Sequence, residues 1–166
     1  PLDEVAGNIM LEKRMSGNAP YYVLGPIPTD IGAGYDHVTA AIGAAASARH
    51  GADLICYITP AEPLALPTEA DVREGVRVTR LAVHIGDLSK YPERRDRDRQ
   101  AAMARRDMRW QDLNDLLLFP EMARSIRDSR RPEQSKTCTM CGDFCAMKKG
   151  MEIFDKEISG DKVANP

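Results

Sequence analysis

The sequence predicts an α/β fold that is assembled from βα units. Over residues 1–91, helical patterns alternate with two short apolar strands, and each strand runs into a loop rich in Gly, Pro, Thr and Asp. An arginine-rich helical stretch and a cysteine-rich tail follow. Because two parallel strands cannot form a self-sufficient sheet, further strands must come from elsewhere. We therefore expect residues 1–91 to be part of a larger parallel α/β fold such as a (β/α)8 barrel of the TIM type, residues 92–131 a helical domain, and residues 132–166 a flexible tail.

The first helix is expected over residues 3–16, where apolar side chains recur at helical spacing until Gly17-Asn18. Residues 21–24 form a short aromatic and β-branched strand, and residues 52–59 a mostly apolar one that suits burial on both faces. Between them, a helix capped by Asp36 should end at His50-Gly51. A capping box at Thr68-x-x-Asp71 predicts a helix to about residue 90. A barrel of this kind carries function on the loops after its strands, here residues 25–34 and 59–67.

The second half is highly charged. Residues 93–109 hold seven arginines against four acids, but the charges are interleaved and no series of aromatic residues accompanies them. This pattern favours a solvated helix face over a nucleic-acid interface. Another helix should begin at Pro120. Residues 128–136 read as a polar lead into the cysteines, and the chain from Gly150 as a loosely ordered tail anchored by Ile153-Phe154.

Composition excludes several classes of protein. The 166 residues carry a net charge of −2, and the hydrophobic share of 43% can support a core. No run of about 18 apolar residues predicts a membrane span, and no export signal is visible. Clustered thiols favour a reducing cytoplasm. The chain starts with Pro1 inside a continuing pattern, so we expect it to be part of a longer protein.

The most informative stretch holds three of the four cysteines, Cys138, Cys141 and Cys145, within eight residues. Three thiols this close cannot all pair with each other, and they suit one metal centre. A structural zinc site and an ordinary iron–sulfur cluster each use four ligands. Three thiolates on a [4Fe–4S] cluster would leave one iron open to S-adenosylmethionine. A zinc knuckle completed by a histidine or another chain, or three reduced thiols without metal, are the alternatives.

Four motifs together resemble the phosphomethylpyrimidine synthase (ThiC) family, in its C-terminal portion. They occur in the family's order and near its spacing across almost the whole chain. They are Gly25-Pro26-x-x-Thr29-Asp30-x-x-x-Gly34-Tyr35-Asp36-His37, Cys56-Tyr57-x-Thr59-Pro60-x-Glu62, Asp71-Val72-x-x-Gly75 and the three-cysteine cluster.

The resemblance implies a radical S-adenosylmethionine carbon–carbon lyase of thiamine biosynthesis. Such an enzyme converts aminoimidazole ribonucleotide to hydroxymethylpyrimidine phosphate, through a deoxyadenosyl radical that takes hydrogen from the ribose. The family pairs a (β/α)8 barrel with a helical domain, which makes residues 1–91 the C-terminal part of the barrel. Its cluster-bearing tail reaches the partner subunit of a homodimer. A reductant such as flavodoxin or ferredoxin is implied. Two alternatives remain, the paralogous hydroxybenzimidazole synthase of cobamide biosynthesis and a non-catalytic iron–sulfur or zinc-binding fragment. Residues 1–166 alone are expected not to turn over.

The resemblance also assigns residues. Cys138, Cys141 and Cys145 would ligate the [4Fe–4S] cluster and leave the fourth iron to S-adenosylmethionine. Tyr22 matches a substrate-contacting tyrosine, and Cys56 matches a cysteine associated with the radical steps. A core tyrosine and a small packing cysteine are the structural alternatives.

Two departures from the family pattern stand out. Three residues separate Cys141 from Cys145, where the family has four. The family also binds a second metal, zinc or a similar divalent ion, with two histidines, and Pro63 stands in place of the second. Proline has no side-chain donor, so the metal is absent, or Glu62 or a residue outside the chain replaces the ligand. We expect His84 to be a packing or surface histidine, and we keep open a phosphate or substrate contact for His37.

Overall fold

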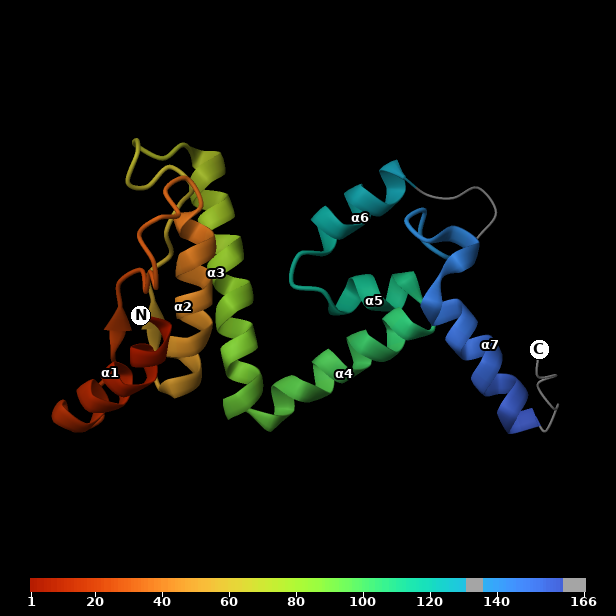
Figure 1. The fold of residues 1–166 in the computed structure, drawn as a ribbon, viewed down its shortest axis with the longest axis horizontal. Coiled ribbons are helices and arrows are strands. Elements are labelled where there is room, and N and C mark those ends of the chain that lie inside the picture. Colours follow the sequence, from red (N-terminus) through yellow and green to blue (C-terminus); the bar gives the residue numbers. More distant parts are fainter. Residues whose placement is uncertain (131–135, 160–166) are drawn as a thin grey trace. The chain divides into compact units, whose positions relative to one another are not determined.

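The computed structural model describes residues 1–130 and 136–159, and the chain divides after Arg95 into two compact units (Figure 1). The three-part division that the sequence suggests stays a prediction. Much of the expected polar lead, residues 131–135, and the end of the tail, residues 160–166, lie outside the described residues.

The first unit consists of α1 (Leu2–Met15), β1 (Tyr22–Val23), α2 (Asp36–His50), β2 (Leu54–Ile55) and α3 (Glu69–Lys90). The two strands are parallel, with Tyr22 opposite Leu54 and Val23 opposite Ile55. Both are shorter than predicted, because among the described residues each strand has a single neighbour to bond with. The order of elements is compatible with part of an α/β fold, and a complete TIM barrel is not shown.

One face of this small sheet is covered and the other is not. Val23 is buried with Ile9 of α1 and Ala52, whereas Leu54 is 59% exposed. The burial on both faces that the apolar strand pattern predicted is therefore not observed for β2. The sheet's uncovered side keeps its apolar side chains in contact with solvent in this structure.

Small residues let the helices pack closely. The buried residues of α2 are almost all small: Ala40, Gly43, Ala44, Ser47 and Ala48, with Asp36 at its first turn. On α3, a Cβ added to Gly86 would come within 2.7 Å of the Ala48 Cβ. The two helices consequently lie side by side along most of their length, as Figure 1 shows.

The helix boundaries follow most of the predicted signals. Thr68 and Asp71 form the expected reciprocal capping box at the start of α3, and Gly51 ends α2 with φ +123°. Pro120 begins α6, as predicted. Asp36 is not the cap of α2. Tyr35 occupies that position without a side-chain bond, and Asp36 lies inside the first turn, where a carboxylate still suits the helix dipole.

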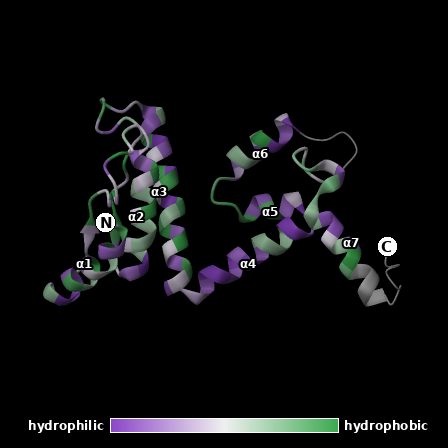
Figure 2. Ribbon diagram, in the orientation of Figure 1, coloured by the Kyte–Doolittle hydropathy of each residue, from purple (hydrophilic) through white to green (hydrophobic). Residues whose placement is uncertain are grey.

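The second unit is helical. It contains most of α4 (Pro92–Arg106), then α5 (Trp110–Leu116), α6 (Pro120–Ser129), a 3₁₀ turn η1 (Gly142–Phe144) and α7 (Ala146–Ser159). Among the residues of α4 only Ala104 is buried, and Figure 2 shows the helix as predominantly hydrophilic, in agreement with a solvated face. The loose tail expected from Gly150 is wrong over the described residues, which continue α7. Ile153 and Phe154 are exposed and do not anchor it. No helix in the described part is both long and apolar enough to cross a membrane.

Candidate functional site

The three clustered cysteines lie on one short loop that leads into α7. Gly142 donates its N–H to the Cys138 carbonyl at 3.3 Å, and Phe144 donates to the Cys141 carbonyl at 3.0 Å. Gly142 has φ +53°, the left-handed conformation that glycine adopts without a steric penalty. Cys141 is exposed, whereas Cys138 and Cys145 are half-buried. Over the described residues, no three His, Cys, Asp or Glu side chains converge as a metal site. The structure thus brings the cysteines to one loop but not to one point.

The chemistry of this loop fits an iron–sulfur cluster. Backbone N–H groups, first that of Met140 and then that of Cys141, bond to the Cys138 sulfur and hold the pKa of its thiol below the usual range. The thiolate is the form of cysteine that binds metals. Three sulfur ligands can hold a cluster with one iron open, and they are one ligand short of a structural zinc site. The donor set therefore fits the cofactor expected from the sequence.

Tyr22 and Cys56, which the family resemblance named separately, lie next to each other. Tyr22 is opposite Leu54 in the parallel ladder, and Cys56 follows two residues later, so all three side chains share one face of the sheet. The Cys56 N–H donates to the Val23 carbonyl at 2.8 Å, which continues the pairing beyond β2. A hydrogen bond with the Cys56 side chain is the first cause that raises the pKa of the Tyr22 phenol.

This face is the uncovered one. Tyr22 is 53% exposed and Cys56 is half-buried, so neither is a closed core residue within this chain. A hydrogen bond that raises a phenol's pKa stabilises its protonated form, so the Tyr22 O–H is engaged with Cys56 and the phenol oxygen can accept a further hydrogen bond from outside. A hydroxyl beside a thiol on an open apolar face is suited to contact a polar substrate.

The loop after β2 is organised by Glu62. Its Oε1 accepts the Thr59 N–H at 3.0 Å, so the carboxylate is turned back onto its own loop. Thr59 is almost fully buried, and its hydroxyl has no partner among the described residues. Pro63 is exposed and has no donor atom. Glu62 therefore fixes the loop through one of its two carboxylate oxygens.

The start of α2, directly after the loop that follows β1, carries further polar groups. The Asp36 Oδ1 and His37 Nδ1 atoms are buried and lack partners among the described residues. The His37 ring stacks on Tyr35, with centroids 6.3 Å apart and planes at 18°. His84 lies half-buried in the middle of α3, in agreement with a packing role. Because buried polar atoms are normally paired, Asp36, His37 and Thr59 mark the strand-end loops as places where further groups can bind.

Two helix glycines, Gly43 of α2 and the motif residue Gly75 of α3, have a structural reason. A Cβ on Gly43 would lie 1.8 Å from the Pro26 carbonyl oxygen, and one on Gly75 would lie 2.4 Å from that of Ile58. Each glycine therefore lets the loop that follows one strand rest directly on a helix backbone. This contact sets the height of both loops above the sheet.

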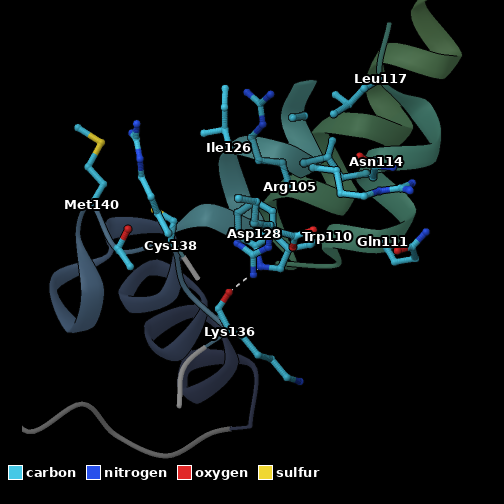
Figure 3. Close-up of a pocket in the computed structure, with 16 residues that line it drawn as sticks. Arg105, Trp110, Gln111, Asn114, Leu117, Ile126, Asp128, Lys136, Cys138 and Met140 are labelled. Atoms are coloured by element: carbon cyan, nitrogen blue, oxygen red, sulfur yellow. Dashed lines mark hydrogen bonds between the residues drawn. The ribbon is translucent and has the colours of Figure 1, made fainter. Parts of the chain in front are cut away.

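The second unit has a cavity of about 960 Å³ beside the start of the cysteine loop (Figure 3). Leu113 and Leu117 of α5 and Ile126 of α6 supply apolar walls, and Cys138 and Met140 reach it from the loop. Sequence reasoning did not single out Trp110, which also lines this cavity and bonds to the Lys136 backbone. Its status as the one tryptophan among the 166 residues was the available signal.

Comparison with known proteins agrees with the motifs. The model of the radical SAM ThiC family matches residues 1–152. A 5-hydroxybenzimidazole synthase of Desulforapulum autotrophicum is 74% identical over 164 residues, which are 99% of this chain and 37% of that protein. A second protein of that name, from Geobacter sulfurreducens, is 63% identical over 98% of this chain and 38% of its own length. Phosphomethylpyrimidine synthase 2 of Methanosarcina mazei is 54% identical over 89% of this chain and 35% of its own length.

The chain thus spans little more than a third of the length of these curated relatives. The resemblance drawn from the motifs is confirmed, including the expectation that the match would cover nearly the whole chain. With a family match over residues 1–152 and relatives of such high identity, the chain belongs to the radical SAM ThiC family.

Proposed function

We propose that the protein containing this chain converts aminoimidazole ribonucleotide to 5-hydroxybenzimidazole by radical S-adenosylmethionine chemistry. One observation carries the choice of product. The relatives whose names give this product are 74% and 63% identical to the chain, whereas the M. mazei pyrimidine synthase is 54% identical. The matches to the first two also extend over 98–99% of the chain instead of 89%.

The second candidate is the reaction that forms hydroxymethylpyrimidine phosphate for thiamine. It is supported by the family match and by the motifs, which both reactions share. The motifs alone placed this reaction first, whereas the sequence identities favour the reaction that forms 5-hydroxybenzimidazole. Pro63, at the position of the family's second metal-binding histidine, is the feature of the chain that separates it from the thiamine pattern.

The cysteine loop would hold the cofactor in either case. Cys138, Cys141 and Cys145 would bind a [4Fe–4S] cluster through their thiolates. When bound, such a cluster supplies the electron for reductive cleavage of S-adenosylmethionine at its open iron. The electron would come from a flavodoxin or ferredoxin, and the active form would be a homodimer. The shorter spacing between Cys141 and Cys145 leaves both thiols on the same loop.

The uncovered face of the sheet would contact the substrate. Tyr22 would accept a hydrogen bond from a ribose hydroxyl at its phenol oxygen, or turn its O–H from Cys56 to a phosphate oxygen. Cys56 would lie beside the ribose as a thiol that can give up hydrogen. The Glu62 bond to Thr59 would hold the neighbouring loop in place. Positioning of this kind can supply several kcal/mol of a barrier, roughly 7–11 in well-oriented systems.

The residues described here do not fit a second divalent metal. Pro63 has no donor atom, and Glu62, one oxygen of which accepts the Thr59 N–H, is the single carboxylate residue between Thr59 and Pro67. We therefore assign no zinc ligand to this chain and no step to such a metal.

Product analysis of the full-length protein tests the proposal. The protein would be reconstituted anaerobically with iron and sulfide, then incubated with aminoimidazole ribonucleotide, S-adenosylmethionine and a reductant. We expect 5-hydroxybenzimidazole in the mass spectrum, together with deoxyadenosine. Hydroxymethylpyrimidine phosphate instead would establish the thiamine reaction.

A matched set of variants separates binding from catalysis. Cys141→Ser should lower iron from about four atoms per chain and abolish deoxyadenosine release. Cys56→Ser should keep the iron and lose product. A colourless, iron-free wild-type protein prepared without oxygen would leave only the non-catalytic alternative and defeat both enzymatic proposals.

A further inference from the structure

The cysteine loop is fixed to the helical unit at its entry. The Trp110 indole N–H, at the first residue of α5, donates to the Lys136 carbonyl at 2.6 Å, as the dashed line in Figure 3 shows. The bonded carbonyl lies two residues before Cys138. An indole has one N–H donor in a rigid ring, so the bond fixes where the backbone enters the loop.

The ring that makes this bond is itself held in place. The Arg127 guanidinium of α6 lies over it, with Cζ 4.1 Å from the ring centroid, well within cation–π range. The two helices are joined by Asn114, whose amide, in the orientation that satisfies both neighbours, donates to the Pro120 carbonyl at 2.9 Å and accepts from Arg124 at 2.7 Å. Trp110 is therefore a preorganised donor on a fixed pair of helices.

Burial in the loop decreases from this contact to Cys141. Thr137 is 2% exposed and Cys138 is half-buried, whereas Met140 is 92% exposed and Cys141 is also exposed. Trp110, Arg127 and Cys138 line the same cavity. Of the three cysteines, Cys138 is thus the one whose place depends on the helical unit.

We propose that Trp110 and Arg127 are positioning residues for the cluster, because they hold the Lys136 carbonyl and so set the position of Cys138. The inference rests on the proposed function only in taking Cys138 as a cluster ligand. Neither residue touches the reacting atoms. A merely structural role in helix packing would change folding and leave the three thiols equivalent.

Conservative variants of the full-length protein distinguish these roles. Trp110→Phe keeps an aromatic ring and loses the indole N–H. Arg127→Gln keeps a polar side chain of similar reach and loses the charge over the ring. Arg127→Lys should restore the cation. Arg105→Gln is the matched control, since Arg105 lines the same cavity without covering the ring. Circular dichroism would verify that each variant is folded.

Two measurements read the loop directly. In the reconstituted protein, loss of iron to a chelator should be about five-fold faster in Trp110→Phe, as for one missing hydrogen bond. It should be about two- to five-fold faster in Arg127→Gln. In the metal-free protein, alkylation of Cys138 should rise by a similar factor relative to Cys145. Arg127→Lys and Arg105→Gln should match the wild type in both.

The outcomes separate the two proposals. Unchanged iron loss and unchanged Cys138 alkylation in folded Trp110→Phe and Arg127→Gln would overturn the positioning role. Equal acceleration in Arg105→Gln would overturn it as well, by showing that any lost arginine has the same effect. A wild-type protein that holds no iron, but in which Cys138 alkylation still responds to Trp110→Phe, would count against the proposed function and leave the anchored loop standing.

Discussion

Gly75→Ala introduces one methyl group at the contact between α3 and the loop after β2. The new Cβ would lie 2.4 Å from the Ile58 carbonyl oxygen and 3.0 Å from its carbon. Ordinary contacts begin at 3.4 Å, so the Ile58 backbone must move by about 1 Å, since a close-packed interior has little room to yield. A backbone atom cannot swing aside like the end of a flexible side chain.

The magnitude follows from two opposing effects. Overpacking costs about 1–3 kcal/mol, and replacing glycine by alanine within a helix returns about 0.5–1 kcal/mol. We therefore expect a net destabilisation on the order of 1 kcal/mol. The effect on catalysis should be larger in relative terms. Ile58 directly precedes Thr59, and a displacement of about 1 Å at positioning groups can cost about 10²-fold in rate.

The assay combines unfolding with kinetics in the full-length, reconstituted protein. Gly75→Ala should lower the melting temperature and reduce kcat/KM for product formation by about 10²-fold. Gly7→Ala is the matched control, because Gly7 lies in α1 with no atom within 4 Å of an added Cβ. It should stabilise by about 0.5–1 kcal/mol and leave the rate unchanged. If Gly75→Ala were as stable and as active as Gly7→Ala, the loop-on-helix contact would have no functional weight.

Three further predictions concern hydrogen-bonded groups of the first unit. Ultraviolet difference spectra of the wild-type protein should show one phenol that titrates above the usual pKa, and Tyr22→Phe should remove that signal. In the wild-type protein, ionisation of Tyr22 should therefore cause no loss of activity near neutral pH. Thr68→Ala should destabilise by about 1 kcal/mol at neutral pH, measured by denaturant unfolding. Thr68 lowers the pKa of Asp71, so the capping contribution is present above the ordinary pKa and is lost as pH falls through the depressed one. The bond to Lys13 holds the Asp53 pKa down, so its contribution to stability is lost as pH falls through that lowered pKa. Asp53→Asn should therefore flatten the dependence of the unfolding free energy on pH at low pH, and an unaltered dependence would contradict this.

Local signals in the sequence predicted the elements well where the local backbone determines them. The Thr68 capping box, the glycine at the end of α2 and the proline that opens α6 each act within one helical turn. The predictions failed where packing decides. Asp36 has the residue type of a cap, yet its position in the first turn of α2 depends on the preceding loop. The helix over residues 150–159 carries no strong stop or start signal.

The candidate site was predictable in part for the same reason. Clustered cysteines are recognised by their spacing, and Tyr22 and Cys56 were identified from the resemblance to the family. Their proximity required the register of the two strands, which depends on residues about thirty positions apart. The roles of Trp110 and Arg127 were not predictable, because a bond between an indole and a backbone carbonyl depends on no residue type at position 136. Only the folded chain displays such contacts.

The exposure pattern of the first unit links its fold to the proposed chemistry. Apolar side chains beside Tyr22 and Cys56 stay open to solvent, including Leu54 at 59% and Leu24 at 75% exposure. A contiguous apolar face with a few polar groups is the usual mark of a binding or interaction surface. The relatives are more than twice as long as the part of them that this chain matches, which gives ample chain to cover such a face. The two strands would then contribute one wall of a closed pocket, and the phenol and thiol on that wall would act in a drier environment, where a hydrogen bond to substrate is stronger than in water.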